Sequence, residues 1–398
     1  MTIVGMRNEK NQRTTLFILS CAAFLGAGIG LASLGPNLAW LAKRTDTELA
    51  LLSWIFTCFS AGVVVMQSQL GLLSTRLGLA GVQALGMALM GVGMLGITVA
   101  PNLALLLLAA TLSGIGFGGI IGAGNILIAR IFQQHSASAL NGVNLFFGLG
   151  AILGPLIVGQ IGTRLDRPQT AIWIGGAILI GLAPFITQVA PHSGNTLSQS
   201  HSSATHQPIR AWPVWLLGLV LMIYTGTEVG FSGWVTFYMQ KSAGMALSEA
   251  TLVASAFWLA LSAGRLLAAG LGMRLKAQHL LLVALSGLVA GTGMLVVSVG
   301  IPAGSLAGAL LFGLACGPVF PTTIAMINKL SHGNSSLAGM SMGLGNSGGM
   351  VLPAMIGLLL TSYGPPFMVA AMLTCTLVMV GLGGVVVMRA DHAQSTRH

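Results

Sequence analysis

Charged side chains are scarce in this chain. Only 6% of the 398 residues are Asp, Glu, Lys or Arg, whereas 55% are hydrophobic. A soluble domain carries about 25% charged residues, and the mean hydropathy of +0.89 also lies far outside the soluble range. The scarcity of charge therefore excludes an ordinary soluble domain and predicts an integral membrane protein.

The residue patterns of enzyme sites are missing too. The four cysteines, Cys21, Cys58, Cys316 and Cys375, all lie in apolar stretches, where we expect them to act as small apolar side chains without disulfides. Their spacing fits no structural metal site. The chain also has no phosphate-binding loop, no helical histidine pair and no nucleophile beside a base. We expect no enzyme activity, no cofactor and no bound metal.

What is present instead is a series of long apolar runs. A bilayer core of about 30 Å is crossed by about 20 helical residues, and uniformly apolar runs favour helices over alternating strands. The sequence therefore predicts an all-α membrane protein with twelve transmembrane helices, at Leu16–Leu41, Leu49–Leu73, Gly81–Val99, Leu103–Phe132, Ala137–Thr163, Thr170–Val189, Val214–Met239, Ala250–Leu271, His279–Val299, Ser305–Ile327, Leu337–Thr361 and Pro366–Met388.

The net charge of +10 follows the predicted topology. With the N-terminus in the cytoplasm, twelve of the seventeen basic residues fall on the inner side, and five fall outside: Lys43, Arg44, Arg164, Arg167 and Lys241. An excess of Lys and Arg inside is typical of membrane proteins. We therefore expect both termini to be cytoplasmic, with contacts to membrane lipid and none to nucleic acid.

The second half of the chain repeats the first at a fixed distance. A shift of 198 positions pairs Gly28 with Gly226, Gly150 with Gly348, Pro155 with Pro353, Gly159 with Gly357 and Thr163 with Thr361. This repeat predicts two pseudo-symmetric six-helix halves, at residues 1–190 and 212–398. The polar segment 191–211 between them is predicted to be a cytoplasmic linker, in which His192, His201 and His206 are solvated rather than metal ligands. Duplicated halves that rock about a central site are a common design of secondary transporters.

Glu228 is the only acidic residue deep within a predicted span. A charged residue near the centre of a membrane helix costs about 2.5 to 3.5 kcal/mol on insertion scales, so its presence requires a function. A carboxyl group shielded from water favours its protonated form and can exchange that proton when a cavity opens. We predict an ion-coupling carboxylate; the alternative is a hydrogen-bonded glutamate that holds two helices together.

Further polar and aromatic residues in the spans suggest a solute site and a gate. Arg265 lies in the inner third of its span, about 10 Å along the membrane normal from Glu228, so a direct salt bridge is not expected; it either anchors the helix or lines the cavity. Pro155 and Pro353 are predicted to bend equivalent helices during gating. Candidate solute contacts are Asn125, Asn144, Tyr224, Trp258, Thr322 and Asn346, with Asn37, Asn141, Thr323, Phe231 and Trp234 as further candidates. Amides suit hydroxyl-rich ligands, although each could instead tie helices together.

The stretch Gly71-Leu-Leu-Ser-Thr-Arg76-Leu-Gly78 resembles the inner loop motif of the major facilitator superfamily, with Ser74 and Thr75 in place of its usual acid. The resemblance assigns Arg76 to gating. Other segments resemble the fucose-permease branch and its sodium-glucose relatives: Gly122-Ala-Gly-Asn125, Asn144 through Pro155, Glu228-Val-Gly-Phe-Ser-Gly-Trp234 with Tyr238, Gly264-Arg265 and Pro318-Val-Phe-Pro-Thr322. This branch implies cation-coupled sugar uptake. The fucose-permease branch uses acidic residues in its first and fourth helices, and these acids are absent from the matching spans here. We therefore expect Glu228 to be the coupling residue.

Two other readings remain open. Gly150-Ala-Ile-Leu-Gly-Pro155 also resembles part of the fifth-helix motif of proton-driven drug exporters, with Val158 where a glycine is expected. A non-transporting receptor or scaffold is the third class. We predict a monomeric inner-membrane symporter that moves a sugar or similar small polar solute with a proton or a sodium ion.

Overall fold

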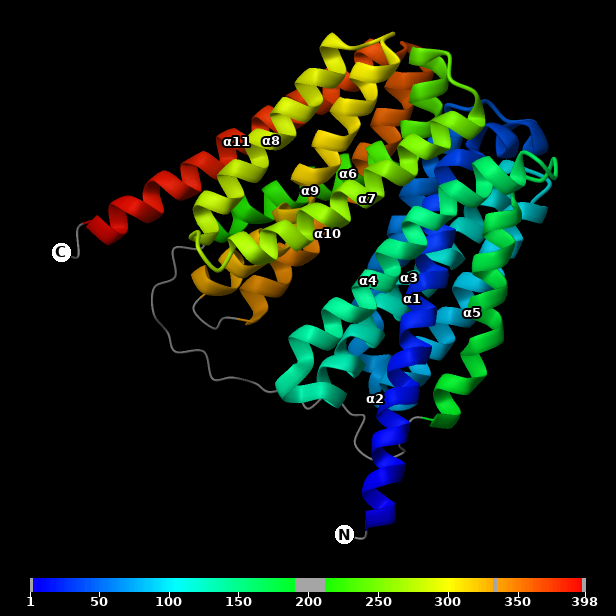
Figure 1. Cartoon of the computed structure of the whole chain (residues 1–398), viewed down its shortest axis with the longest axis vertical. Helices are drawn as coiled ribbons and strands as arrows, with labels where there is room; N and C mark the ends of the chain where they lie inside the picture. The colour runs from blue at the N-terminus through cyan, green and yellow to red at the C-terminus, as the bar shows by residue number, and fades with distance from the viewer. Residues whose placement is uncertain (1–2, 190–211, 332–334, 396–398) are drawn as a thin grey trace. The chain divides into compact units, whose positions relative to one another are not determined.

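The computed structural model describes residues 3–189, 212–331 and 335–395 (Figure 1). All regular structure in these ranges is helical: α1 Ile3–Thr45, α2 Trp54–Val99, α3 Leu103–Phe132, α4 Ser136–Leu156, α5 Thr170–Val189, α6 Trp212–Ala243, α7 Leu247–Leu271, α8 Ala277–Val297, α9 Pro302–Leu330, α10 Ser335–Ser362 and α11 Pro365–Ser395, with short 3-10 turns at Leu51–Ser53 and Gln133–His135 and a π-helical turn, η3, at Ile157–Gly162.

The prediction of twelve separate spans needs one correction. In the part of the chain that the structure describes, eleven helices are long and apolar enough to cross a membrane. The second and third predicted spans both lie in α2, which is 46 residues long and has a non-helical residue, Gly78, at φ 71° and ψ 165°. A positive φ costs glycine little because it has no Cβ. The polar break around Arg76 is thus a single-residue break and not a loop.

The chain divides into two compact units, unit 1 at Met1–Gln199 and unit 2 at Ser200–His398. Each is described by itself. The predicted linker 191–211, with His192, His201 and His206, lies outside the described residues.

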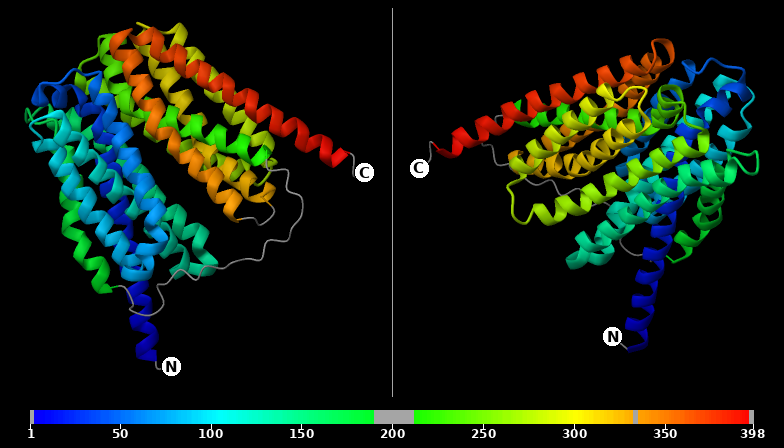
Figure 2. Two further views of the ribbon diagram at one scale, coloured as in Figure 1. Left: turned by 180° about the vertical axis from the view of Figure 1, so that it is seen from behind. Right: turned by 45° about the horizontal axis from the view of Figure 1, so that its top comes forward.

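Helix neighbours within unit 2 correspond to those within unit 1. In unit 1, α1 packs against α4 and α5, and α2 packs against α3 and α5. In unit 2, α6 packs against α10 and α11, α7 and α8 pack against α9, and α8 packs against α11. Figure 2 shows these helices side by side from two further directions. The helix contacts of the two units become equivalent under one matching. In it, α6, α9, α10 and α11 correspond to α1, α3, α4 and α5, and α7 and α8 correspond to the segments of α2 before and after Gly78.

Paired glycines allow the closest crossings in both units. A Cβ built on Gly150 of α4 would lie 2.2 Å from the carbonyl oxygen of Leu25 in α1. At the matching position of α10, a Cβ on Gly348 would lie 1.7 Å from the carbonyl oxygen of Met222 in α6. Backbones this close leave no room for any side chain, which is how small residues permit helix association in membranes.

The matched prolines lie at buried positions in α4 and α10. Pro155 is followed directly by η3, whereas α10 continues as an α-helix past Pro353. The carbonyl oxygen of Pro353 accepts a hydrogen bond of 3.1 Å from Nε1 of Trp234 in α6. Trp234 is therefore a packing residue that supports the proline position, and the candidate role of its ring as a solute contact is not favoured.

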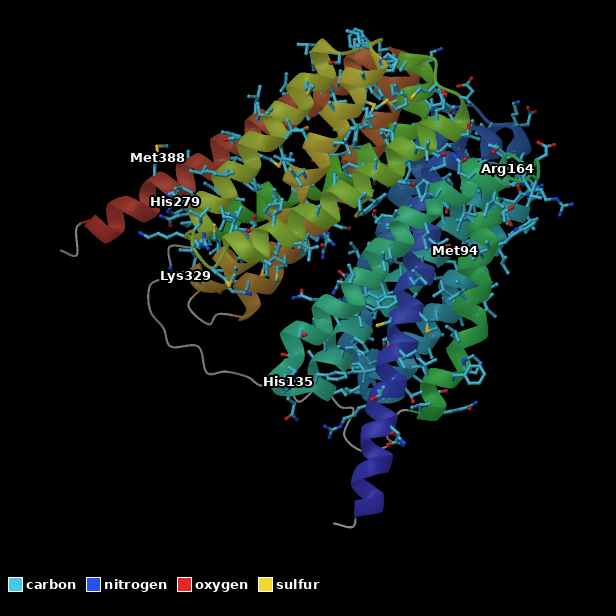
Figure 3. The ribbon with its side chains drawn as sticks, viewed as in Figure 1. Met94, His135, Arg164, His279, Lys329 and Met388 are labelled. Carbon is cyan, nitrogen blue, oxygen red and sulfur yellow. The ribbon has the colours of Figure 1, made fainter. Side chains whose placement is uncertain are left out.

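Basic residues lie at the helix ends of each unit. In unit 1, Arg13, Arg76 and Arg130 belong to the end where α3 meets α4, and the opposite end holds Lys43, Arg44, Arg164 and Arg167; His135 and Arg164 mark the two ends in Figure 3. In unit 2, His279 at the start of α8 and Lys329 near the end of α9 share one end (Figure 3). Which of these ends faces the cytoplasm stays a prediction.

Candidate functional site

The candidate coupling residue lies in the middle of α6, on the face that carries Tyr224. Tyr224 and Glu228 are four positions apart, so their side chains are neighbours on one helix face. Tyr224 has no exposed surface, whereas Glu228 is only half-buried. Glu228 therefore retains some accessible surface, whereas Tyr224 has none.

Tyr224 joins this face of α6 to α9. Its hydroxyl donates a hydrogen bond of 3.0 Å to the carbonyl oxygen of Cys316. The carboxyl group of Glu228, one helical turn further along α6, lies close enough to interact with the same hydroxyl. Tyr224 is a buried side chain that bridges α6 and α9, and its predicted contact with the solute stays a prediction.

Arg265 of α7 is the positive charge that acts on Glu228. The two side chains interact electrostatically, and among the ion pairs and hydrogen bonds of the described residues none joins them directly. Arg265 is half-buried. Its backbone lies against α9, because a Cβ built on Gly317 would be 2.4 Å from the Arg265 nitrogen. Arg265 is thus held at a fixed depth beside the Tyr224 and Cys316 contact.

The part of α9 at this crossing is weakened by prolines. Pro318 and Pro321 lie inside the helix, and a proline cannot donate the bond to the carbonyl four residues earlier. These carbonyls belong to Leu314 and Gly317. A Cβ on Gly264 of α7 would lie 2.0 Å from the Leu314 oxygen, so that oxygen faces the glycine backbone, where a weak Cα–H···O contact is the available partner.

Unit 1 holds a second polar group, built from two amides. Nδ2 of Asn144 in α4 donates to the Leu140 carbonyl at 2.8 Å and to Oδ1 of Asn125 in α3 at 3.2 Å. A carbonyl can only accept, so the Leu140 contact fixes which end of Asn144 is its NH₂ group. The Asn125 end that faces it must then be oxygen. The bonds of the pair leave the NH₂ group of Asn125 and the Oδ1 of Asn144 as its remaining donor and acceptor, and both residues are half-buried.

The other predicted contacts are divided between core and accessible positions. Trp258 is 5% exposed and packs edge-on against Phe257. Thr322 is buried, Asn346 is half-buried, and Arg76 is exposed at the α2 break. Their contact with a solute, and the gating role of Arg76, stay predictions.

Three of the further candidates are packing residues. Phe231 is fully buried between Phe257 and Phe312. The hydroxyl of Thr323 donates to Val319 of its own helix, as the amide of Asn37 does to Ser33. In contrast, Asn141 is exposed.

Sequence reasoning missed the contribution of Cys316 to the group around Glu228 in unit 2, and it did not assign the packing role of two glycines there. Cys316 contributes through its backbone carbonyl, which carries no sequence signal. Gly264 and Gly317 permit the α7 and α9 crossing, and their signal was available, since Gly317 belongs to the internal repeat. The part of the chain that the structure describes contains no group of three or more His, Cys, Asp or Glu residues that could hold a metal ion.

Comparisons with known proteins place the chain among transporters. The family model described as Major Facilitator Superfamily matches residues 16–353. Sodium-dependent glucose transporter 1 of Homo sapiens is 24% identical over 383 residues, covering 86% of this chain and 73% of that protein. The TsgA homolog of Erwinia tasmaniensis is 27% identical over 233 residues, which is 57% of each chain.

Solved structures share the fold. A bacterial homolog of the human lysosomal transporter Spinster, in an inward-facing and unoccupied conformation, has a TM-score of 0.74 at 11% identity and covers 95% of this chain and 97% of its own. The nucleoside transporter NupG has a TM-score of 0.69 at 15% identity, with coverage of 95% and 98%.

Proposed function

Since this chain belongs to the Major Facilitator Superfamily, we propose that it is a secondary active symporter that moves a sugar or a similar small neutral solute together with a proton. Two six-helix halves would alternate access to a central site. The repeat supports this architecture: Gly78, where α2 is interrupted, corresponds under the shift of 198 to Lys276, which lies between α7 and α8. Counting α2 as two spans gives the expected twelve.

The observation that carries the proposal is the setting of Glu228. It is the only acid within the apolar part of any described helix that spans, and it is half-buried rather than sealed. Tyr224 and Arg265 interact with its carboxyl group, so both a neutral and a charged form have partners. A carboxyl group with partners in both states is suited to bind and release a proton in each transport cycle.

Asn125 and Asn144 are our candidates for solute recognition. Adjacent amide donor and acceptor groups match neighbouring hydroxyls of a sugar, each of which donates and accepts. The name of the human glucose transporter relative supports a sugar, and the nucleoside named for NupG is a second neutral, hydroxyl-rich candidate. We propose a proton rather than sodium because a single carboxyl group is sufficient to bind and release a proton.

Export of drugs in exchange for protons is the competing function. The Gly150 to Pro155 segment favours it, because Gly150 and Gly154 of α4 both lie against the α1 backbone and Pro155 leads into η3.

The symporter proposal also includes location in the inner membrane, cytoplasmic termini and a monomeric state.

Transport by purified protein in liposomes would separate the two functions. The panel consists of D-glucose, L-fucose, uridine and the cationic dye ethidium, and a trapped pH indicator reports proton movement. The symporter predicts proton entry with a sugar or nucleoside. Proton release driven by ethidium, with no response to the other three, would establish the exporter instead.

Removing the amide of Asn144 should weaken solute binding. In Asn144→Leu, the Oδ1 of Asn125 loses the NH₂ donor of Asn144 and the solute loses a hydrogen-bond partner, in a site shielded from water, so we expect KM to rise about 10- to 100-fold. Asn141→Leu changes an exposed amide three residues earlier in the same helix and should leave KM within about twofold. Equal KM values for the two variants would remove Asn144 from the site. The measurement is initial uptake rate against solute concentration.

A further inference from the structure

The hydroxyl of Tyr224 has two neighbours and one hydrogen. It lies between the backbone carbonyl of Cys316, to which it donates at 3.0 Å, and the carboxyl group of Glu228. A tyrosine hydroxyl donates once and accepts with its lone pairs. While its hydrogen is used on Cys316, it can only accept from Glu228, which requires Glu228 to carry a proton.

Loss of that proton reverses the pattern. A carboxylate has no hydrogen to donate, and hydrogen bonds to charged groups are about twice as strong as neutral ones. The Tyr224 O–H bond would rotate toward Glu228 and leave the Cys316 carbonyl without this donor. No covalent bond of Tyr224 breaks, and the proton from Glu228 passes to water.

The released carbonyl belongs to the weakest turn of α9. Pro318 and Pro321 have already removed the helical donors to Leu314 and Gly317, on either side of Cys316. The Tyr224 bond therefore supports a turn of α9 from which the two prolines remove two internal hydrogen bonds. The same turn crosses α7 at Gly264 and Arg265.

We infer that Tyr224 is a positioning residue that transmits the protonation state of Glu228 to the proline-containing turn of α9. The inference rests on the proposed coupling role of Glu228. The titratable and charged groups that interact with Glu228 are Tyr224 on its own helix and Arg265 on α7, and Cys316 of α9 interacts with Glu228 in turn. Of the other helices against α6, α10 contains no titratable side chain, and α11 carries only Cys375 before its charged end.

Hydrogen–deuterium exchange of α9 tests this without a solute. Exchange of the peptide spanning Leu314 to Pro321 is compared at a mildly acidic and a mildly alkaline pD, after correction for the intrinsic chemical rate. Wild type should exchange about fivefold faster at alkaline pD, the change in local opening that one ordinary hydrogen bond makes. Glu228→Gln should exchange slowly at both values, because its amide still donates to Tyr224. Tyr224→Phe should exchange rapidly at both.

Tyr238→Phe is the matched control. It removes the same atom from another fully buried tyrosine of α6, whose hydroxyl has no hydrogen-bond partner, so it should behave as wild type. A wild-type pD response that persists in Tyr224→Phe would overturn the inference while leaving the coupling role intact. A response that persists in Glu228→Gln, or a flat wild-type profile, would also overturn the inference, and the coupling role itself is decided separately by solute accumulation in Glu228→Gln.

A second measurement uses wild-type protein alone and so does not depend on the folding of a variant. Wild-type protein with ¹³C-carbonyl cysteine should show an infrared amide band that shifts to higher frequency between acidic and alkaline pH, as the Cys316 carbonyl loses its hydroxyl donor. Absence of this shift would contradict the inference.

Discussion

Glu228→Gln is expected to abolish uphill solute accumulation while leaving exchange of solute across the membrane intact. With one proton per solute and no membrane potential, wild type should accumulate solute about tenfold for each pH unit of gradient, since both correspond to about 1.4 kcal/mol. Glutamine keeps the size and the hydrogen-bonding capacity of the protonated acid but cannot release a proton. Inside and outside concentrations should therefore become equal in the variant.

The control is Asp166→Asn, which removes one negative charge from an exposed loop of unit 1. Asp166 has a φ of 53°, a conformation that asparagine also adopts readily, so the fold should be undisturbed and accumulation should match wild type. The measurement is radiolabelled solute uptake with a clamped membrane potential, beside counterflow of the same solute. Accumulation by Glu228→Gln at the wild-type level would disprove its coupling role.

Gly348→Ala should produce the largest loss of stability among single methyl additions in unit 2. Its Cβ would lie 1.7 Å from the Met222 carbonyl oxygen and 2.6 Å from the carbonyl carbon, both backbone atoms of α6 that cannot move without separating α6 from α10. Overpacking of this kind costs about 1 to 3 kcal/mol and sometimes more. For a unit of this size that lowers Tm by about 2 to 12 °C.

Gly343→Ala in the same helix has nothing within 4 Å of the added Cβ. Both variants gain helix propensity, about 1 kcal/mol at most. The difference in Tm between them therefore reports the steric clash at Gly348. Thermal unfolding in detergent, followed by size-exclusion chromatography, compares the two variants. Equal Tm values would show that α6 and α10 do not cross at Gly348.

The lone acid and the polar amides could be predicted from the sequence because such residues are rare in apolar helices. Glu228 was singled out in this way, and Asn125 and Asn144 were both named. Their hydrogen bond could not be predicted, since a contact between α3 and α4 depends on how the helices cross. The role of Tyr224 was predicted incompletely for a similar reason: its partner is a backbone carbonyl, which has the same chemistry at every residue.

Helix breaks were harder to predict than helices. The apolar runs gave the helices, but the sequence did not distinguish a loop from the single-residue break at Gly78. The matched Pro155 and Pro353 predicted similar bends, yet only Pro155 leads into η3, at Ile157–Gly162. Local packing decides this difference: Val158 of η3 lies in a buried apolar cluster with Ile29 and Ala171, contacts that a hydropathy pattern does not specify.

Proton uptake on solute binding tests the central claim most directly. Purified protein in weakly buffered detergent, above the pH at which Glu228 loses its proton, is mixed with the solute identified in liposomes while a pH indicator is recorded. A symporter coupled through Glu228 should take up close to one proton per bound solute, and Glu228→Gln should take up none while still binding. Equal uptake by the two proteins, or proton release by wild type, would contradict symport through this carboxyl group.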